Sequence, residues 1–171
     1  MNEEEKIFKE VTLLWSMCPC KKFLGSATAK TIRKYLRFHK FNVSQENVYI
    51  QGILHEMDLL VLKKIVNNDK LIYGPDEILA VLEIKFRGSF GKKDITNLKG
   101  IYNQIKKTNK HISCLYVTLL ENETYGYRIT KSNTGFNNFE LFFHKGSVPK
   151  GAIKRTGNWD RLLLYLSKVG K

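Results

Sequence analysis

Three ionisable residues interrupt two segments that are otherwise apolar enough to form buried β-strands. Asp58 ends the run HEMD just ahead of LLVL, and Glu83 and Lys85 stand inside the run ILAVLEIKF. Side chains alternate between the two faces of a strand, so Glu83 and Lys85 share one face while Leu82 and Ile84 point to the other. An unpaired ion in a core strand is costly, which makes these residues a strong constraint on the fold. If the two strands are neighbours, the three charged groups converge on one patch.

This convergence of carboxylates around an ammonium group predicts a divalent-metal site. By the same alternation, Glu56 shares a strand face with Asp58, so it is a further candidate ligand. Mg²⁺ prefers oxygen ligands and is commonly held by one or two carboxylates together with water and substrate phosphate. The structural alternative is that Glu83 and Lys85 form an ion pair and Asp58 caps the end of a strand.

The charge of the chain indicates a polyanionic partner. The sequence holds 29 Lys and Arg against 16 Asp and Glu, a net charge of +13 at pH 7. The basic residues are grouped: no acid lies between Glu10 and Glu46, and Asp94 is the one acid from Lys85 to Lys110. Such blocks supply salt-sensitive affinity for nucleic acid. The alternatives are a basic surface without a partner and one that binds an acidic protein.

The chain is expected to form one α/β domain over residues 1–171, because its length suits a single core and no linker divides it. The order of the elements predicts a mixed β-sheet flanked by helices, with a core at about 28–120 and additions at 1–27 and 121–171. Helices are predicted at 4–15, from a cap at Ser26 or Thr28 to about 39, at 94–107 and from 158. Strands are predicted within 46–64, as one extended strand or a bent pair with a bulge at Gly52, and at 78–86, 111–120, 125–130 and 139–143.

Several classes of protein are not favoured by the sequence. No apolar run approaches the roughly 20 residues of a membrane span, and the acidic start MNEEEKIFKE is not a secretory or mitochondrial signal. Three cysteines cannot all pair, so we expect no disulfide framework and a cytoplasmic location. A zinc set of Cys18, Cys20, Cys114 and His111 has the wrong spacing. No motif for a small-molecule cofactor is present.

Asp58, Glu83 and Lys85, in this order on successive strands with a helix after them, resemble the catalytic motif of the PD-(D/E)xK nuclease superfamily. The segments GILHEMDLLVL and AVLEIKFRG match an acid that closes one strand and an E-x-K motif with apolar flanks on the next. The segment GSATAKTIRKYLRFHKFNV matches the amphipathic helix that leads into the sheet. The resemblance covers about residues 28–120 and implies a restriction-endonuclease-like, Holliday junction resolvase-like core of αβββαβ order.

The resemblance also implies an activity, namely Mg²⁺-dependent hydrolysis of phosphodiester bonds in DNA, with Mn²⁺ able to substitute. Asp58 and Glu83 would hold the metal together with the backbone carbonyl of Ile84, and Glu56 remains a further candidate. Lys85 would orient or help deprotonate the attacking water and offset charge in the transition state. A restriction or defence enzyme and a structure-specific nuclease both stay open. A homodimer would let two sites cut two strands.

Candidate DNA contacts follow the motif. Lys92 and Lys93 open the next helix, where backbone N–H groups and ammonium groups bind phosphate. On that helix, Gln104 matches a residue type that contacts phosphate or the metal-bound water in the superfamily, and a polar residue on a solvated face explains it equally well. The full set of candidates is Arg87, Lys92, Lys93, Lys99, Gln104 and Lys106.

The sequence departs from the superfamily pattern in one respect and offers an alternative in another. Many relatives carry a glutamate in the helix before the sheet, which is absent here, and Glu10 in the first helix is the candidate substitute. Pro75-Asp76 spells the motif literally, but it lies in a turn only seven residues before Glu83. The main rival function is a nucleic-acid-binding module with a nuclease fold and no catalysis.

Overall fold

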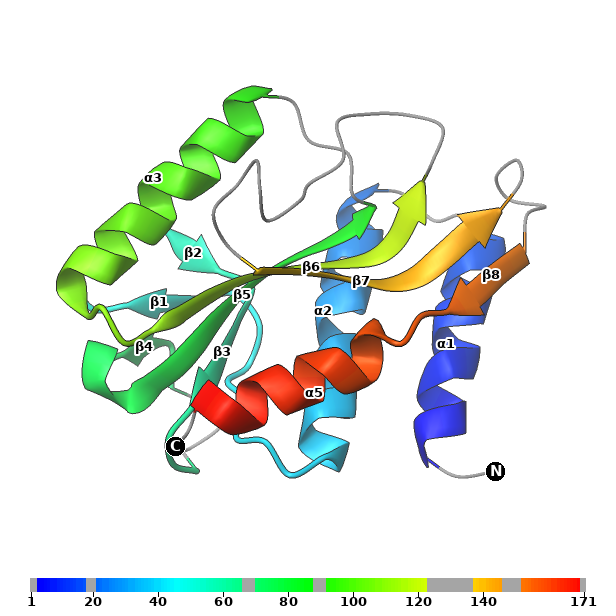
Figure 1. The fold of residues 1–171 in the computed structure, drawn as a ribbon, viewed down its shortest axis with the longest axis horizontal. Helices are drawn as coiled ribbons and strands as arrows, with labels where there is room; N and C mark the ends of the chain where they lie inside the picture. Colours follow the sequence, from blue (N-terminus) through cyan, green and yellow to red (C-terminus); the bar gives the residue numbers. More distant parts are fainter. Residues whose placement is uncertain are drawn as a thin grey trace.

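A computed structural model describes residues 3–17, 21–65, 70–87, 92–122, 137–145 and 152–169 (Figure 1). The helices are α1 (Glu3–Met17), α2 (Lys21–Phe38), the short 3₁₀ helix η1 (Pro75–Glu77), α3 (Lys92–Thr108) and α5 (Asn158–Val169). The strands are β1 (Val48–Ile50), β2 (Glu56–Met57), β3 (Leu59–Leu62), β4 (Ile72–Tyr73), β5 (Ile78–Arg87), β6 (Ser113–Asn122), β7 (Asn137–Lys145) and β8 (Ala152–Arg155).

The main sheet has five strands in the order β3-β5-β6-β7-β8. Strands β5, β6 and β7 are parallel to one another, while β3 and β8 pair antiparallel at the two edges. The α3 helix connects β5 to β6, as a crossover between parallel strands requires. The outer edge of β3 is covered by the chain at 42–44, where Val43 bridges Val61 and Ser44 exchanges hydrogen bonds with Leu60.

Helices cover both faces of the main sheet (Figure 1). On one face, α1, α2 and α5 pack over Leu82, Ile84 and their neighbours, and Trp159 stacks edge-on against Phe8 and Tyr35. On the other face, which we call the α3 face, α3 and a second, smaller sheet cover Val81, Tyr116 and their neighbours. Apart from Glu83 and Lys85 on the α3 face, both faces of β5 and β6 are mainly apolar, which explains the near-continuous hydrophobic runs of these strands.

The small sheet has three strands in the order β2-β1-β4. Between β1 and β2, Ile53 N–H donates to the Ile50 carbonyl at 2.9 Å, and Gly52 takes a φ of +83°, which glycine adopts without strain. The chain then leaves the small sheet at Met57 and enters the main sheet at Leu59. Asp58 therefore lies at the bend between two sheets.

The predicted mixed sheet flanked by helices is confirmed, while several details differ. The segment 46–64 forms three short strands in two sheets, with Gly52 in a turn, so Glu56 and Asp58 do not share a face of one strand. The α2 helix begins at Lys21, so neither Ser26 nor Thr28 is its cap. The predicted strand at 125–130 lies outside the described residues. Within the described ranges, no helix is long and apolar enough to cross a membrane.

The turn before β5 is held by Glu77, and its loss should be measurable. One Glu77 oxygen accepts the Gly74 N–H at 2.6 Å and the other pairs with Lys70 at 2.6 Å. The Lys70 hydrogen bond, followed by that of Gly74, lowers the Glu77 pKa from 4.5, so its stabilisation exists above that pH and is lost as pH falls through the lower folded value. Because the side chain is partly exposed, we expect Glu77→Gln to cost about 1 kcal/mol at pH 7. Urea unfolding at pH 7 and pH 3 should show this loss shrinking in acid, and equal stability at pH 7 would contradict it.

Candidate active site

The structure brings Asp58, Glu83 and Lys85 together on the α3 face. Strand β3 pairs antiparallel with β5 through Leu59 and Leu82, and this register places Asp58 beside Glu83. Lys85 Nζ lies 2.5 Å from Glu83 Oε1 and 3.9 Å from Asp58 Oδ2. The convergence expected from neighbouring strands is therefore present, and one cationic group reaches both carboxylates.

Asp58 is fixed at the bend by two hydrogen bonds. Its Oδ2 accepts the backbone N–H of Ile84 at 2.6 Å, and its backbone carbonyl accepts the N–H of Asn47 at 3.4 Å. The Asp58 side chain thus gives the Ile84 N–H of β5 an acceptor at the point where the backbone of the neighbouring segment turns away into the small sheet. Asn47 has a φ of 59°, a conformation that asparagine tolerates better than most residues. One Asp58 oxygen is therefore held, and the other is free of a described partner.

The site has an excess of negative charge, because two carboxylates share one ammonium group. Burial, followed by the charge of Glu83, raises the pKa of Asp58 to about 6, against the opposing effects of Lys85 and the Ile84 N–H. Burial alone would lower the pKa of Lys85, but attraction to Glu83 and Asp58 outweighs it and raises that pKa. Lys85 is therefore an ammonium ion, and the pair of carboxylates holds more negative charge than it neutralises.

Two tyrosines, neither of which the sequence assigned to the site, flank the acidic pair on the α3 face. Tyr102 on α3 is buried and donates its hydroxyl hydrogen to the Leu115 carbonyl at 2.5 Å. Tyr116 on β6 is the register partner of Glu83. Burial and then the Glu83 charge raise the pKa of both phenols, so both remain protonated. In the sequence they are indistinguishable from core aromatics, because they sit at apolar positions of a helix and a buried strand.

The other candidate acids lie outside this cluster. Glu56 is exposed and accepts the Tyr49 hydroxyl at 3.5 Å, although its charge makes a small contribution to the raised pKa of Asp58. Asp76 lies in η1, ahead of β5, next to Asn109. Glu10 forms an ion pair with Lys34 at 2.9 Å, between helices that pack on the opposite face of the sheet.

The candidate DNA contacts are spread along α3. Lys93 and Gln104 are exposed, and Lys99 is half-buried one turn before Tyr102, toward the start of the helix. Lys106 lies in the last turn, where its ammonium donates to the Lys110 carbonyl at 3.0 Å. Asp94, in the first turn of α3, acts on the charge of Lys85, so the start of this helix adjoins the site, while Lys106 lies at its other end. The side chains of Arg87 and Lys92 lie outside the described part of the chain.

The donor set fits a hard cation and does not fit zinc. Among the described residues, no group of three or more His, Cys, Asp and Glu side chains is placed to hold a metal. Cys114 is buried as a free thiol and His111 is exposed, while Cys18 and Cys20 lie outside the described residues. Two carboxylates already share one cation here, and two carboxylates with water and phosphate are a common Mg²⁺ environment. Asp58 and Glu83 could therefore hold Mg²⁺ together with water and a substrate phosphate.

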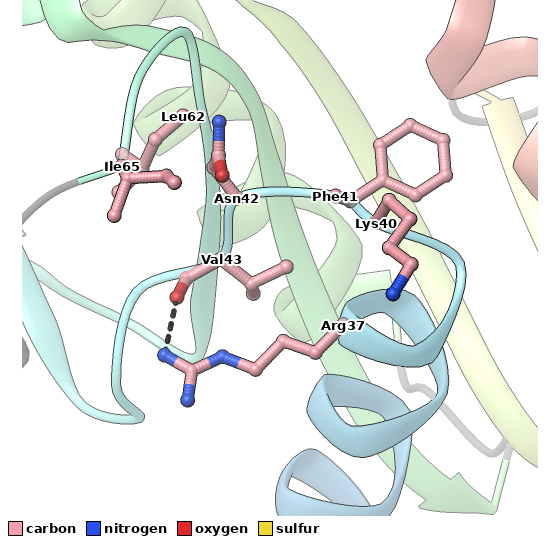
Figure 2. A pocket seen from close by; sticks show the side chains of 7 residues that line it. All are labelled: Arg37, Lys40, Phe41, Asn42, Val43, Leu62 and Ile65. Carbon is pink, nitrogen blue, oxygen red and sulfur yellow. Dashed lines mark hydrogen bonds between the residues drawn. The ribbon is translucent and has the colours of Figure 1, made fainter.

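A separate basic pocket lies at the other end of β3. Arg37 donates to the Val43 carbonyl at 2.9 Å across this pocket of about 440 Å³ (Figure 2). Leu62, at its wall, ends the strand that Asp58 precedes, so the pocket is distinct from the acidic cluster. Its lining residues are Arg37, Lys40, Phe41, Asn42, Val43, Leu62 and Ile65.

The mixed sheet, the helices on both of its faces and the bend at Asp58 define a restriction-endonuclease-like fold. Among solved structures, NucC of P. aeruginosa ATCC27853 in its cAAA-bound form is similar to this chain, with a TM-score of 0.63 and 11% sequence identity. The likeness covers 96% of this chain and 86% of the NucC chain. No family model and no curated protein matches the sequence. At this identity the likeness establishes the fold.

Proposed function

We propose that this protein is a metal-dependent endonuclease of the PD-(D/E)xK type that hydrolyses phosphodiester bonds in DNA with Mg²⁺. The observation that carries the proposal is the Lys85 ammonium between the carboxylates of Asp58 and Glu83, on neighbouring strands of a restriction-endonuclease-like fold. The net charge of +13 supports a nucleic-acid substrate. The likeness to NucC adds support at the level of the fold.

Each residue of the cluster has a role in this chemistry. Asp58 and Glu83, with the Ile84 carbonyl, would hold Mg²⁺, which supplies positive charge beside the scissile phosphate. The Ile84 N–H fixes one oxygen of Asp58 and thereby orients the other as a ligand. Lys85 is held protonated by its carboxylate neighbours, so it acts by orienting the attacking water and by stabilising negative charge that develops in the transition state.

The test is cleavage of supercoiled plasmid by the purified protein in Mg²⁺ or Mn²⁺, with EDTA as the metal-free control. Nicking or linearisation that requires the metal and is lost in Glu83→Gln supports the nuclease. Salt-sensitive DNA binding without cleavage in either metal, on plasmid and on a four-way junction, would instead favour the nucleic-acid-binding module. The cleaved fragments also distinguish the two nuclease classes, because discrete bands indicate a sequence-specific enzyme and preferred junction cleavage a structure-specific one.

The placement of the α3 lysines gives a matched pair of variants for the DNA interface. We expect Lys99→Ala to weaken DNA binding and to reduce the slope of log affinity against log salt by about 0.9, as loss of one phosphate contact requires. Lys106→Ala, which removes an ammonium bound to the Lys110 carbonyl at the far end of the helix, should leave the slope unchanged. Fluorescence anisotropy over a salt series measures both. Equal changes of DNA affinity and salt slope in the two variants would show that Lys99 does not contact DNA in preference to Lys106.

A homodimer is also proposed, since it would let two active sites cut the two strands of a duplex at one place. Sedimentation velocity of the protein with and without DNA tests this. A monomer in both conditions, together with nicking as the sole plasmid product, would contradict it.

A further inference from the structure

Thr118 on β6 carries a buried hydroxyl next to the acidic cluster. It is the register partner of Lys85, and neighbouring strands lie about 4.8 Å apart. Its side chain is on the α3 face, as are those of Glu83 and Lys85, because it lies two residues after Tyr116, which packs in the core of that face. Val117, between them on the strand, packs in the core of the opposite face. Thr118 is 2% exposed, and within the described structure its Oγ1 has no hydrogen-bond partner.

A hydroxyl in this position is costly unless it has a partner in some state of the protein. Valine has nearly the same shape, favours strands equally well and would leave no polar atom unsatisfied. The other residues of β6 that face the two cores are apolar or aromatic, such as Leu115, Tyr116 and Leu119. The hydroxyl of Thr118 is therefore best explained by a partner that is placed elsewhere in the metal-free arrangement.

Lys85 is the group that must move when a metal binds. Its ammonium now occupies the space between Glu83 and Asp58, at 2.5 and 3.9 Å from their oxygens. A divalent cation held by the same two carboxylates repels an ammonium at such distances. The flexible four-carbon stem of lysine allows the ammonium to swing while the backbone stays in place.

On β6, the strand that pairs with β5, the register partner of Lys85 is Thr118, whose buried hydroxyl lies on the same face. Glu140 on β7 is in turn the register partner of Thr118, so a carboxylate-bearing residue lies beyond it in the same row across the sheet. An ammonium that moves from Glu83 toward β6 thus meets a hydrogen-bond acceptor and a second acidic residue, rather than an apolar wall.

We infer that Thr118 is a positioning residue for Lys85, whose ammonium it accepts when a divalent cation displaces that ammonium from Asp58 and Glu83. The inference rests on the proposed metal site. It deepens that proposal by giving Lys85 two positions: between the carboxylates without metal, and against the Thr118 hydroxyl with metal. In the second position the ammonium remains beside the cation without competing for its ligands.

The test is a double-mutant cycle on metal affinity, measured on the full chain without DNA. Mn²⁺ is the probe, and the electron paramagnetic resonance signal of the free ion gives the bound fraction. We expect Thr118→Val to weaken Mn²⁺ binding about tenfold, because the displaced ammonium loses its hydrogen bond. Thr118→Ser, which restores the hydroxyl, should recover the affinity. In a Lys85→Met background, where no ammonium needs a second position, Thr118→Val should have no effect.

Thermal unfolding in EDTA provides the structural control, since Thr118→Val should melt no lower than the wild type. Asp94→Asn is the matched competitor, because Asp94 in the first turn of α3 also raises the pKa of Lys85. Two results would overturn the inference. One is that Thr118→Val weakens Mn²⁺ binding equally with Lys85 and with Met at position 85. The other is that the effect of Lys85→Met on Mn²⁺ affinity depends on Asp94 and not on Thr118. Failure of the wild type to bind Mn²⁺, or binding unchanged in Asp58→Asn, would overturn the metal site itself.

Discussion

Replacement of Lys85 by alanine should lower the rate of metal-dependent DNA cleavage by about 100- to 10,000-fold and leave DNA affinity nearly unchanged. The ammonium is held beside both carboxylates, so in the proposed reaction it acts where charge develops rather than where DNA docks. Loss of an interaction made in the transition state lowers kcat and kcat/KM together, with little change in binding. Single-turnover cleavage and fluorescence anisotropy of the same preparation measure the two quantities.

Lys70 provides the matched control for this substitution. Its ammonium pairs with Glu77 at 2.6 Å and its side chain is 34% exposed, against 39% for Lys85, but it lies at the turn before β5. Lys70→Ala should therefore cleave at close to the wild-type rate. If Lys85→Ala retained full cleavage, Glu83 and Lys85 would be a structural ion pair, and the nuclease site would have to be sought elsewhere.

The three cluster residues were accessible from the sequence because charge stands out in an apolar strand. Glu83 and Lys85 break the hydrophobic run of β5 at alternating positions, which fixes their common face without knowledge of the partner strand. Their convergence with Asp58 depended on the condition that the two strands are neighbours, and β3 does pair with β5. What could not be derived is the bend at Asp58, because it depends on where the chain exchanges one sheet for another, and β1, β2 and β4 are too short to show a periodic pattern.

The roles of Tyr116 and Thr118 and the start of α2 could not be derived, because nothing in the sequence distinguishes these residues from their neighbours. Strand β6 is covered on both faces, so Tyr116 and Thr118 stand in a run without alternation, and their proximity to Glu83 and Lys85 appears only in the register. The predicted start of α2 was wrong because Thr28 is of a residue type that is common at the N-cap of a helix. The neighbouring Thr31 shows how threonines are accommodated inside this helix, since its hydroxyl donates to the Ala27 carbonyl at 2.9 Å.

Asp58→Asn is expected to lower the rate of cleavage by about 1,000-fold or more. The same change should make the metal-free protein more stable at pH 8. The loss of activity follows from removal of a charged metal ligand. The gain in stability follows from the site's excess negative charge, because burial and Glu83 raise the pKa of Asp58 from 3.8 to about 6. An asparagine oxygen can still accept the Ile84 N–H, so the bend keeps its anchor while the carboxylate charge is removed.

The size of this gain in stability depends on pH. Between 3.8 and about 6 the folded protein binds more protons at Asp58 than the unfolded chain does, so the free energy of unfolding falls as pH rises through this window. Asp58→Asn removes that fall, and the variant should exceed the wild type by about 2 kcal/mol at pH 8 and by nothing at pH 3.5. Urea unfolding in EDTA at the two pH values measures the difference.

Addition of Mg²⁺ should reverse the order of stability at pH 8. The wild type gains free energy of unfolding as the ion binds the folded state, and Asp58→Asn, which lacks a charged ligand, gains little. A carboxylate that merely capped a strand end would behave in the opposite way: its replacement would destabilise the metal-free protein, and Mg²⁺ would not distinguish the two proteins. The pair of unfolding curves with and without Mg²⁺ therefore separates a metal ligand from a structural cap at Asp58, independently of any assay for cleavage.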